Sequence, residues 1–278
     1  MKVLKFGGGC LKDSESIKIF FDILKTYDTD IIIVVSAFDK LTNLLETIYY
    51  SENKRFILVE SFFKDLMLSL KFSNTLIDSI LMELSRLTSI HMSEADTLAI
   101  GELISSKILS AYLHELKFPH TFLHAPNIIK TNSSGINSSI NLKSTIIKKN
   151  NYISYYPNNL RAPILTQGFI GGFDDNGKCQ IACLGREGSD YSAAIFGSIF
   201  NATQVVLFKD VDGIYSVDPK QDKSATLFSS LSYEDAFNIC NQKNTVVHPK
   251  TISQLKDKRI PLVIKSFNNL EKPGTIII

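Results

Sequence analysis

An unbroken run of apolar residues at positions 31–35, Ile-Ile-Ile-Val-Val, constrains the fold of this chain more than any other segment. A strand with one wet face alternates apolar and polar residues, whereas a run that is apolar throughout is typical of a parallel strand buried on both faces. Ser36 and Ala37 follow the run, and after a loop at 38–42 a helix is predicted from about Asn43. The segment therefore predicts an α/β fold with helices on both faces of a parallel sheet.

The same order of strand, loop and helix occurs at the N-terminus. Residues 2–6 are predicted to form a strand, residues 7–9 a glycine turn, and the apolar stripe between Ile17 and Leu24 one face of a helix. Repetition of this unit indicates a doubly wound arrangement, in which ligands bind at the carboxyl ends of the strands.

Helices and strands are predicted to alternate along the rest of the chain. Helical spacing covers residues 53–87 and 95–116, and Asn176-Gly177 predicts the turn of a β-hairpin between 167–173 and 180–184. The other predicted elements are strands at 120–125, 128–131, 162–166, 204–209 and 263–267, and helices at 191–200 and after the capping residue Ser232. We place the boundary between two lobes near Ala162.

Charge balance and cysteine usage argue against several classes of function. Thirty basic and 28 acidic side chains leave a net charge of +2, which gives no argument for nucleic acid or an anionic membrane as a partner. No apolar run has the length of a membrane span, and no signal-peptide core follows the N-terminus, so we expect a cytoplasmic protein. The four cysteines form no Cys-x-x-Cys pair and no zinc-ligand spacing, so we expect no protein-only metal site.

Residues 183–194 combine an arginine, a serine and a carboxylate on a glycine-containing turn that enters a helix. Ser189 or Asp190 is predicted to cap that helix, whose first N–H groups favour an anion. Arg186 suits a carboxylate or phosphate, and a neighbouring carboxylate suits an ammonium group, so the turn is able to hold a zwitterion. From these residues alone, an ordinary capped helix is an equal alternative.

Lys5 lies at the end of the first predicted strand, one residue before the glycine turn. The sequence matches neither a Walker loop nor the glycine pattern of dinucleotide-binding folds. A glycine nest beside a lysine is still suited to phosphate, although a tight turn between strand and helix explains the same residues.

Seven short motifs follow one another in a fixed order along the chain. They are Lys5-Phe6-Gly7-Gly8, Val34-Val35-Ser36-Ala37 with Thr42-Asn43, Gly101-Glu102, Leu184-Gly185-Arg186 with Gly188-Ser189-Asp190, Asp210-Val211-Asp212-Gly213-Ile214-Tyr215 with Asp218-Pro219, His248-Pro249, and Pro273-Gly274-Thr275. This set resembles the aspartate kinases over essentially the whole chain. The resemblance implies the amino acid kinase fold, a three-layer α/β sandwich around an eight-stranded, mainly parallel sheet, with an amino-acid-binding lobe at 1–161 and a nucleotide-binding lobe at 162–278.

The resemblance also implies a reaction. An aspartate kinase transfers the γ-phosphoryl group of ATP to the side-chain carboxylate of L-aspartate and forms 4-phospho-L-aspartate, the first step of lysine, threonine and methionine biosynthesis. Because a carboxylate is already ionised at neutral pH, the site has to align two anions and supply positive charge rather than a general base. The implied partners are L-aspartate, ATP with Mg²⁺ on its phosphates, and a second copy of the chain in a homodimer.

The resemblance assigns roles to individual residues. Lys5 contacts the transferring phosphate, and Asp190 orients that lysine and the substrate. The remaining substrate contacts are Arg186 to the α-carboxylate, Glu102 to the α-ammonium group, and hydrogen bonds from Ser36, Thr42 and Ser189. Without the family match, Glu102 is expected to be a solvated helix residue. The implied nucleotide-binding residues are Lys5, Gly7, Gly8, Gly9, Lys209, Asp210, Tyr215, Lys220, Thr245 and Val246.

Several positions depart from the family pattern. Gly9-Cys10 replaces hydroxyl residues, Cys183 replaces a threonine, and Glu187 replaces a glycine beside Arg186 and adds negative charge there. Lys220 stands for an arginine, and Lys243-Asn244-Thr245 stands for Gly-Ala-Lys. The sequence ends soon after Pro273-Gly274-Thr275, where regulatory ACT domains usually begin, so we expect no feedback inhibition by lysine or threonine through such domains.

Two alternatives remain open from the sequence. One is a kinase of the same fold that acts on another carboxylate or a carbamate. The other is a catalytically degenerate binding or regulatory subunit, which the departures at Gly9-Cys10, Glu187 and Thr245 favour.

Overall fold

A single mostly parallel sheet organises the computed structural model, which describes residues 1–28, 30–52, 55–89, 92–217, 219, 222, 224–241 and 246–278. Within these residues, eight strands lie in the order β3-β4-β2-β1-β7-β9-β10-β8, and every neighbouring pair is parallel except β9 and β10. The sheet strands are β1 (Lys2–Phe6), β2 (Ile31–Val35), β3 (Thr121–Leu123), β4 (Ile164–Gln167), β7 (Gln204–Lys209), β8 (Ser230–Leu231), β9 (Leu262–Ser266) and β10 (Thr275–Ile277). The predicted α/β class and sheet are confirmed.

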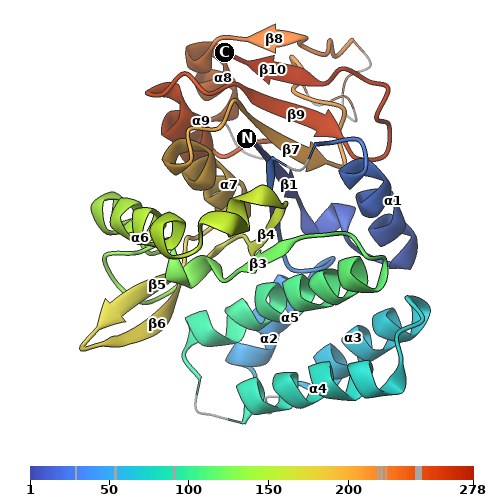
Figure 1. Cartoon of the computed structure of the whole chain (residues 1–278). Helices are drawn as coiled ribbons and strands as arrows, with labels where there is room; N and C mark the ends of the chain where they lie inside the picture. Colours follow the sequence, from blue (N-terminus) through green and yellow to red (C-terminus); the bar gives the residue numbers. More distant parts are fainter. Residues whose placement is uncertain are drawn as a thin grey trace.

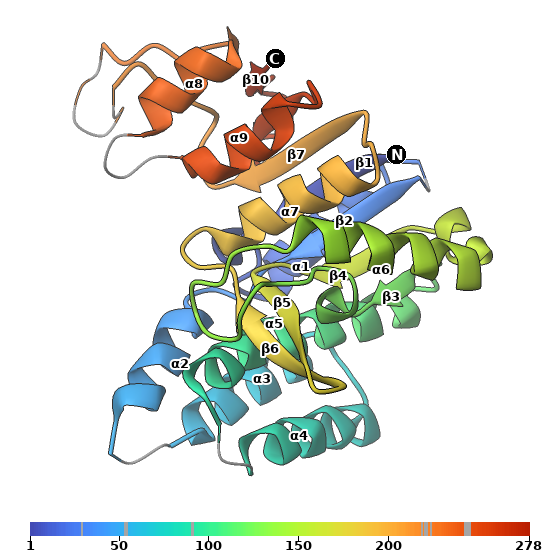
Figure 2. The same cartoon turned by 90° about the vertical axis from the view of Figure 1, so that its left-hand side faces the viewer.

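Helices cover both faces of this sheet (Figures 1 and 2). The helices α6, α7 and α9 lie on one face, and α1 and α5 lie on the other, with α2, α3 and α4 packed beside α5. Their bounds are α1 (Ser14–Leu24), α2 (Leu41–Tyr50), α3 (Ile57–Ser69), α4 (Asn74–Thr88), α5 (Glu94–Glu115), α6 (Leu142–Tyr155), α7 (Gly188–Ile199), α8 (Tyr233–Cys240) and α9 (Pro249–Lys256), with 3-10 turns η1 (Gly8–Cys10), η2 (Ala125–Asn127) and η3 (Pro157–Arg161).

The central strands form because their residues have apolar neighbours on both sides. All five residues of β2 are buried, as the apolar run at 31–35 predicts. In β1, Phe6 stacks on Phe208 of β7 with ring centroids 4.7 Å apart and meets Phe20 of α1 edge to face. The parallel register pairs Lys5 with Leu207, so the carboxyl ends of β1 and β7 lie side by side.

A hairpin, β5 (Ile170–Asp175) and β6 (Lys178–Cys183), projects from the sheet and is visible in both views (Figures 1 and 2). Its two turn residues, Asn176 and Gly177, have φ values of 47° and 80°, in the left-handed region that such turns require. The predicted hairpin is confirmed.

Some local predictions differ from the structure. Residues 128–131 form only isolated bridges rather than a strand, because the N–H of Lys130 donates to Oγ1 of Thr145 at 2.9 Å instead of to a neighbouring strand. The unassigned stretch before Ala162 contains α6, which Asn141 caps by accepting a hydrogen bond from the N–H of Ser144. Helix α2 begins at Leu41, so Thr42 lies in its first turn rather than in a loop.

Strand β4 follows the boundary predicted near Ala162 yet lies between β2 and β3 in the sheet. The chain therefore returns to its first half before it builds β7. The division into lobes at 1–161 and 162–278 stays a prediction.

Among the described residues, none of the helices combines the length and the apolar character that crossing a bilayer requires.

Candidate functional site

Three charged side chains meet at the carboxyl ends of β1 and β7. Lys5 is the buried, next-to-last residue of β1, Lys209 ends β7, and Asp190 lies in the first turn of α7. The Nζ atom of Lys5 lies 2.6 Å from Oδ1 of Asp190, and the Nζ atom of Lys209 lies 2.6 Å from Oδ2. The side chain of Asp190 is fully buried. We call these three residues the Lys-Asp-Lys cluster.

The ionisation of the Lys-Asp-Lys cluster follows from competition between burial and pairing. Burial raises the pKa of Asp190, but the charges and hydrogen bonds of Lys209 and Lys5 outweigh it and hold that pKa below its ordinary value. Burial lowers the pKa of Lys209, and the carboxylates of Asp190 and Glu187 more than compensate and raise it. The carboxylate and the Lys209 ammonium are therefore charged at neutral pH. Two lysines share the one buried carboxylate of the cluster, which suits a phosphate ligand, and Glu187 adds a second, partly exposed carboxylate 3.4 Å from the Nζ atom of Lys209.

The predicted capping of α7 is wrong. The N-cap is Glu187 rather than Ser189 or Asp190, and the cap makes no side-chain hydrogen bond. Asp190 is turned toward the two lysines instead, because their charge attracts the carboxylate more strongly than a helical N–H does. Ser189 packs closely against Gly168, where an added Cβ would come within 2.6 Å of the serine Cβ.

A second polar group, Glu102 of α5, lies against the loop that follows β2. Its Oε1 atom accepts a hydrogen bond from the N–H of Ala37 at 3.2 Å, and its Oε2 atom is buried without a partner among the described residues. Gly101 permits this approach, because a Cβ there would lie 2.8 Å from the Cβ of Ala37. The side chain of Glu102 is only 2% exposed, so the solvated-surface alternative is excluded.

Burial raises the pKa of Glu102 to about 8, although the N–H of Ala37 and the charge of Lys5 act in the opposite direction. A buried carboxyl group with one free oxygen has a clear complement, namely a cationic donor that pairs with it and restores its charge. An amino-acid ammonium group meets that requirement.

The glycine turn after β1 contributes backbone groups to the site. Gly8 and Gly9 open the 3-10 turn η1, whose first N–H groups have no acceptor within the turn. Cys10 points inward: its Sγ donates to the carbonyl of Phe208 at 3.4 Å, and burial raises its pKa to about 11. The thiol is therefore a neutral packing group rather than a substitute for the hydroxyl usual in the family.

Gly8→Ala is expected to destabilise the fold by about 1–3 kcal/mol, because an added methyl group overpacks the site. A Cβ at Gly8 would lie 2.5 Å from the carbonyl oxygen of Asp39 and 2.7 Å from that of Ala37. Gly9→Ala is the matched control, since a Cβ there meets nothing within 4 Å. Urea unfolding of both variants checks the difference, and equal midpoints would contradict the close packing of Gly8.

The other predicted substrate residues lie on separate segments of the chain. Ser36 is buried directly after β2, and Thr42 is half-buried in α2. Arg186 is exposed and forms no ion pair with any described residue. The structure therefore leaves its guanidinium available to an anion, and its role stays a prediction.

The predicted nucleotide residues are less closely grouped. Asp210 is exposed, Val246 is half-buried, and the hydroxyl of Tyr215 donates to Oδ2 of Asp212 at 3.2 Å. Lys220 and Thr245 lie outside the described residues, as do Lys243, Asn244 and Asp218. The nucleotide contacts of these residues stay predictions.

The sequence did not reveal that Lys209 and Lys5 share one carboxylate, or that Glu187 contacts Lys209. The sequence does contain a signal for the shared carboxylate, because each lysine lies at or next to the carboxyl end of a predicted strand. What local sequence lacks is the strand order that puts β1 beside β7.

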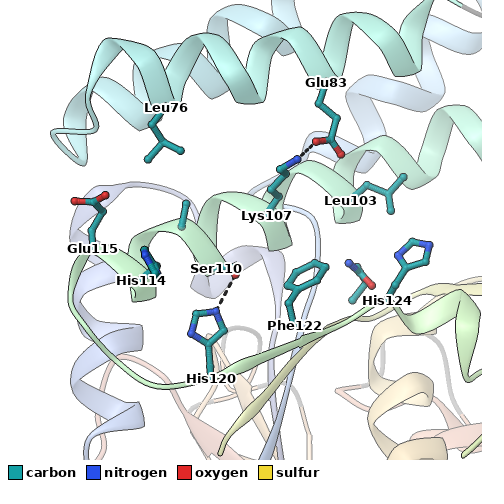
Figure 3. Close-up of a pocket in the computed structure, with 12 residues that line it drawn as sticks. Leu76, Glu83, Leu103, Lys107, Ser110, His114, Glu115, His120, Phe122 and His124 are labelled. Carbon is teal, nitrogen blue, oxygen red and sulfur yellow. Dashed lines mark hydrogen bonds and ion pairs between the residues drawn. The ribbon is translucent and has the colours of Figure 1, made fainter. Parts of the chain in front are cut away.

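A separate cavity of about 620 Å³ opens between α4, α5 and the edge strand β3 (Figure 3). Its lining includes Lys107 paired with Glu83, and His120, whose Nε2 lies 2.8 Å from Oγ of Ser110. None of the predicted site residues lines it. The candidate site is therefore defined by its charged groups rather than by cavity size. Within the part of the chain that the structure describes, no group of three or more His, Cys, Asp or Glu side chains could hold a metal ion.

The sheet and the Lys-Asp-Lys cluster together define an α/β protein with a candidate anion-binding centre at the carboxyl ends of its parallel strands. The chain belongs to the amino acid kinase family, whose model matches residues 1–266.

Aspartokinases are among the relatives of this chain, which agrees with the resemblance that the motifs indicate. The chain is 31% identical to an aspartokinase of Chlamydia pneumoniae over 98% of its own length and 62% of that protein. It is 29% identical to a bifunctional aspartokinase/homoserine dehydrogenase of Buchnera aphidicola over 100% of its own length and 36% of the relative. The chain thus spans only part of each of these relatives.

Among solved structures, E. coli aspartokinase III in complex with aspartate and ADP has a similar fold. The two share 24% identity and a TM-score of 0.87, over 100% of this chain and 64% of the other. This likeness confirms the amino acid kinase fold.

Proposed function

We propose that the protein is an aspartate kinase, which transfers the γ-phosphoryl group of ATP to the side-chain carboxylate of L-aspartate and releases 4-phospho-L-aspartate and ADP. The observation that carries the proposal is the pairing of two unlike subsites: the Lys-Asp-Lys cluster for phosphate, and the buried, half-satisfied Glu102 for an ammonium group. The names of the relatives and the aspartate and ADP bound to the E. coli structure support it.

The chemistry requires little proton transfer. An aspartate side chain has a pKa of about 3.9, so its carboxylate attacks the γ-phosphorus directly. A new P–O bond forms while the bond from the γ-phosphorus to the bridging oxygen of ADP breaks, and ADP leaves with the electron pair. The ammonium groups of Lys5 and Lys209 stabilise the charge on the transferring group, and Asp190 holds both in place. Mg²⁺ carried by the nucleotide phosphates supplies further positive charge.

Substrate orientation is assigned to the surrounding residues. Glu102 accepts the α-ammonium group of aspartate, and Arg186 forms two hydrogen bonds to its α-carboxylate. Ser36, Thr42 and Ser189 supply hydroxyl groups to the substrate. Gly7, Gly8 and Gly9 offer backbone N–H groups to the phosphates, and Asp210, Tyr215, Lys220, Thr245 and Val246 border the nucleotide. In this scheme residues 1–161 bind the amino acid and residues 162–278 bind ATP.

A hydroxamate assay tests the proposal directly, because hydroxylamine traps an acyl phosphate. With L-aspartate, ATP and Mg²⁺, we expect a hydroxamate to accumulate together with ADP. Preference for an acid that lacks the α-ammonium group would refute the role of Glu102 and point to another carboxylate kinase. Nucleotide binding without turnover of any acid would instead identify a degenerate binding subunit.

Aspartate binding at pH 7 is expected to release close to one proton. Glu102, with a pKa of about 8, is mostly protonated in the free protein and has to ionise when it pairs with the ammonium group. Apparent affinity for aspartate should therefore rise up to about tenfold per pH unit below pH 8 and level off above it. Titration calorimetry in buffers of different ionisation enthalpy measures the release, and an enthalpy independent of the buffer would contradict it.

The cellular setting of this reaction is also part of the proposal. We place the protein in the cytoplasm, as a homodimer that serves lysine, threonine and methionine biosynthesis. These three points are supported by the resemblance to aspartate kinases alone. Light scattering of the purified protein measures the oligomeric state.

A further inference from the structure

Glu187 occupies an unfavourable backbone conformation next to the Lys-Asp-Lys cluster. Its φ of 56° and ψ of 25° lie in the left-handed region, which a long side chain adopts only at a cost in energy that glycine avoids. The residue directly precedes α7, three positions before Asp190. Its side chain contacts Lys209, so a residue in this conformation alters the charge beside the cluster.

The carboxylate of Glu187 faces Lys209. Its Oε2 atom lies 3.4 Å from the Nζ atom, whereas Oδ2 of Asp190 lies 2.6 Å from the same nitrogen. The two acids differ in exposure: the side chain of Asp190 is fully buried, and that of Glu187 is 39% exposed. Lys209 therefore pairs closely with the buried carboxylate of Asp190 and less closely with the partly exposed carboxylate of Glu187.

This second carboxylate changes the charge of the site. Lys5 and Lys209 carry two positive charges, which Asp190 and Glu187 together balance. Without Glu187 the same group has an excess of one positive charge. An incoming phosphate thus meets a lysine that already contacts an anion on its solvent-facing side. The contact between Glu187 and Lys209 has to break before a phosphate oxygen takes its place.

We infer that Glu187 is an internal anion that occupies Lys209 in the free protein and competes with the nucleotide phosphates for it. This inference rests on the proposed function and deepens it, because it makes nucleotide affinity adjustable through one residue beside Arg186. Glu187 contacts Lys209 rather than the substrates, so it acts on nucleotide binding through that lysine.

Calorimetric titration of ADP with Mg²⁺, in the absence of aspartate, tests the inference in the full chain. Glu187→Gln keeps the size of the side chain and removes its charge, and we expect the Kd for ADP to fall about tenfold, with a steeper dependence on salt. Glu60→Gln is the matched control, because Glu60 is an exposed acid in the first turn of α3, and its Kd should equal that of the wild type.

Two further variants separate charge from backbone and locate the effect. Glu187→Gly relieves the left-handed conformation and should tighten ADP binding to a similar extent while raising the Tm. In a Lys209→Met background, Glu187→Gln should no longer change the Kd, because the competing contact is gone.

The outcomes distinguish this inference from the proposed function. If the wild type binds ADP and Glu187→Gln binds it equally or more weakly, the competition is overturned and the kinase proposal stays intact. Weaker binding would show instead that Glu187 holds Lys209 in its productive position. If neither protein binds ADP, the nucleotide site itself is wrong and the inference fails with it.

Discussion

Lys5→Met is expected to lower kcat for phosphoryl transfer about 10³-fold, the scale of removing one preorganised donor from a charge-stabilising site. The substitution removes the ammonium group and keeps an unbranched side chain of similar length in the buried end of β1. Asp190 retains Lys209 at 2.6 Å, so the carboxylate is not left unpaired and the fold is expected to survive. Because the lost interaction acts chiefly on the transferring group, the KM for ATP should change far less than kcat.

The matched control is Lys2→Met in the same strand. Lys2 is exposed, and its Nζ atom lies 5.6 Å from the ring centroid of Tyr27 rather than near the site. Its kcat should equal that of the wild type. Steady-state kinetics of the three proteins, with circular dichroism to confirm folding, makes the comparison. A Lys5→Met enzyme that keeps more than a tenth of the wild-type kcat would remove this lysine from the chemistry.

Glu102→Gln is expected to raise the KM for aspartate about 100-fold and to stabilise the free protein at the same time. The amide keeps an acceptor for the N–H of Ala37 but cannot neutralise a buried ammonium group, which accounts for the loss of substrate binding. The KM for ATP should stay close to that of the wild type. The Glu102→Gln variant thus tests recognition of the amino acid separately from recognition of the nucleotide.

The gain in stability follows from the pKa of Glu102. Burial raises that pKa from 4.5 to about 8, so the native state binds a proton that the unfolded state has lost, and wild-type stability falls as pH rises from 4.5 to 8. At pH 7 this amounts to about 3 kcal/mol, which the neutral amide avoids. The difference in Tm between variant and wild type should be small at pH 4.5 and large at pH 8.

Glu115→Gln is the control for this second prediction, because Glu115 is an exposed residue at the end of the same helix. It should change neither the KM for aspartate nor the pH dependence of the Tm. A Glu102→Gln protein that is less stable than the wild type at pH 8 would show that the carboxylate has a partner which the amide cannot replace.

Local sequence patterns predict an element correctly where the burial or turn preference of a few adjacent residues determines its structure. The run at 31–35 predicts β2, and Asn176-Gly177 predicts the hairpin turn, because each depends on a few adjacent residues. Helix α6 was missed because few of its residues face the core: of its fourteen residues, only Thr145 is fully buried. A helix without a clear apolar stripe gives little periodic signal.

The site was less accessible to sequence reasoning than the fold. Lys5, Glu102 and Asp190 were found through the family motifs, whereas the sharing of Asp190 between two lysines depends on which strand lies beside β1. The expected capping by Asp190 failed for the same reason. Capping preferences describe neighbours along the chain, and this carboxylate is held by residues far from it in sequence.

The insertion of β4 between β2 and β3 bears on how the protein can be synthesised and assembled. When the ribosome has made the first 161 residues, β2 and β3 have no strand between them, and Lys5 lacks both its carboxylate and the neighbouring β7. Neither half of the chain is thus a finished folding unit, because pairings in the middle of the sheet join early and late residues. All three residues of the Lys-Asp-Lys cluster precede β8, β9 and β10 in the chain, so the charged site is fully synthesised before the last three strands of the sheet.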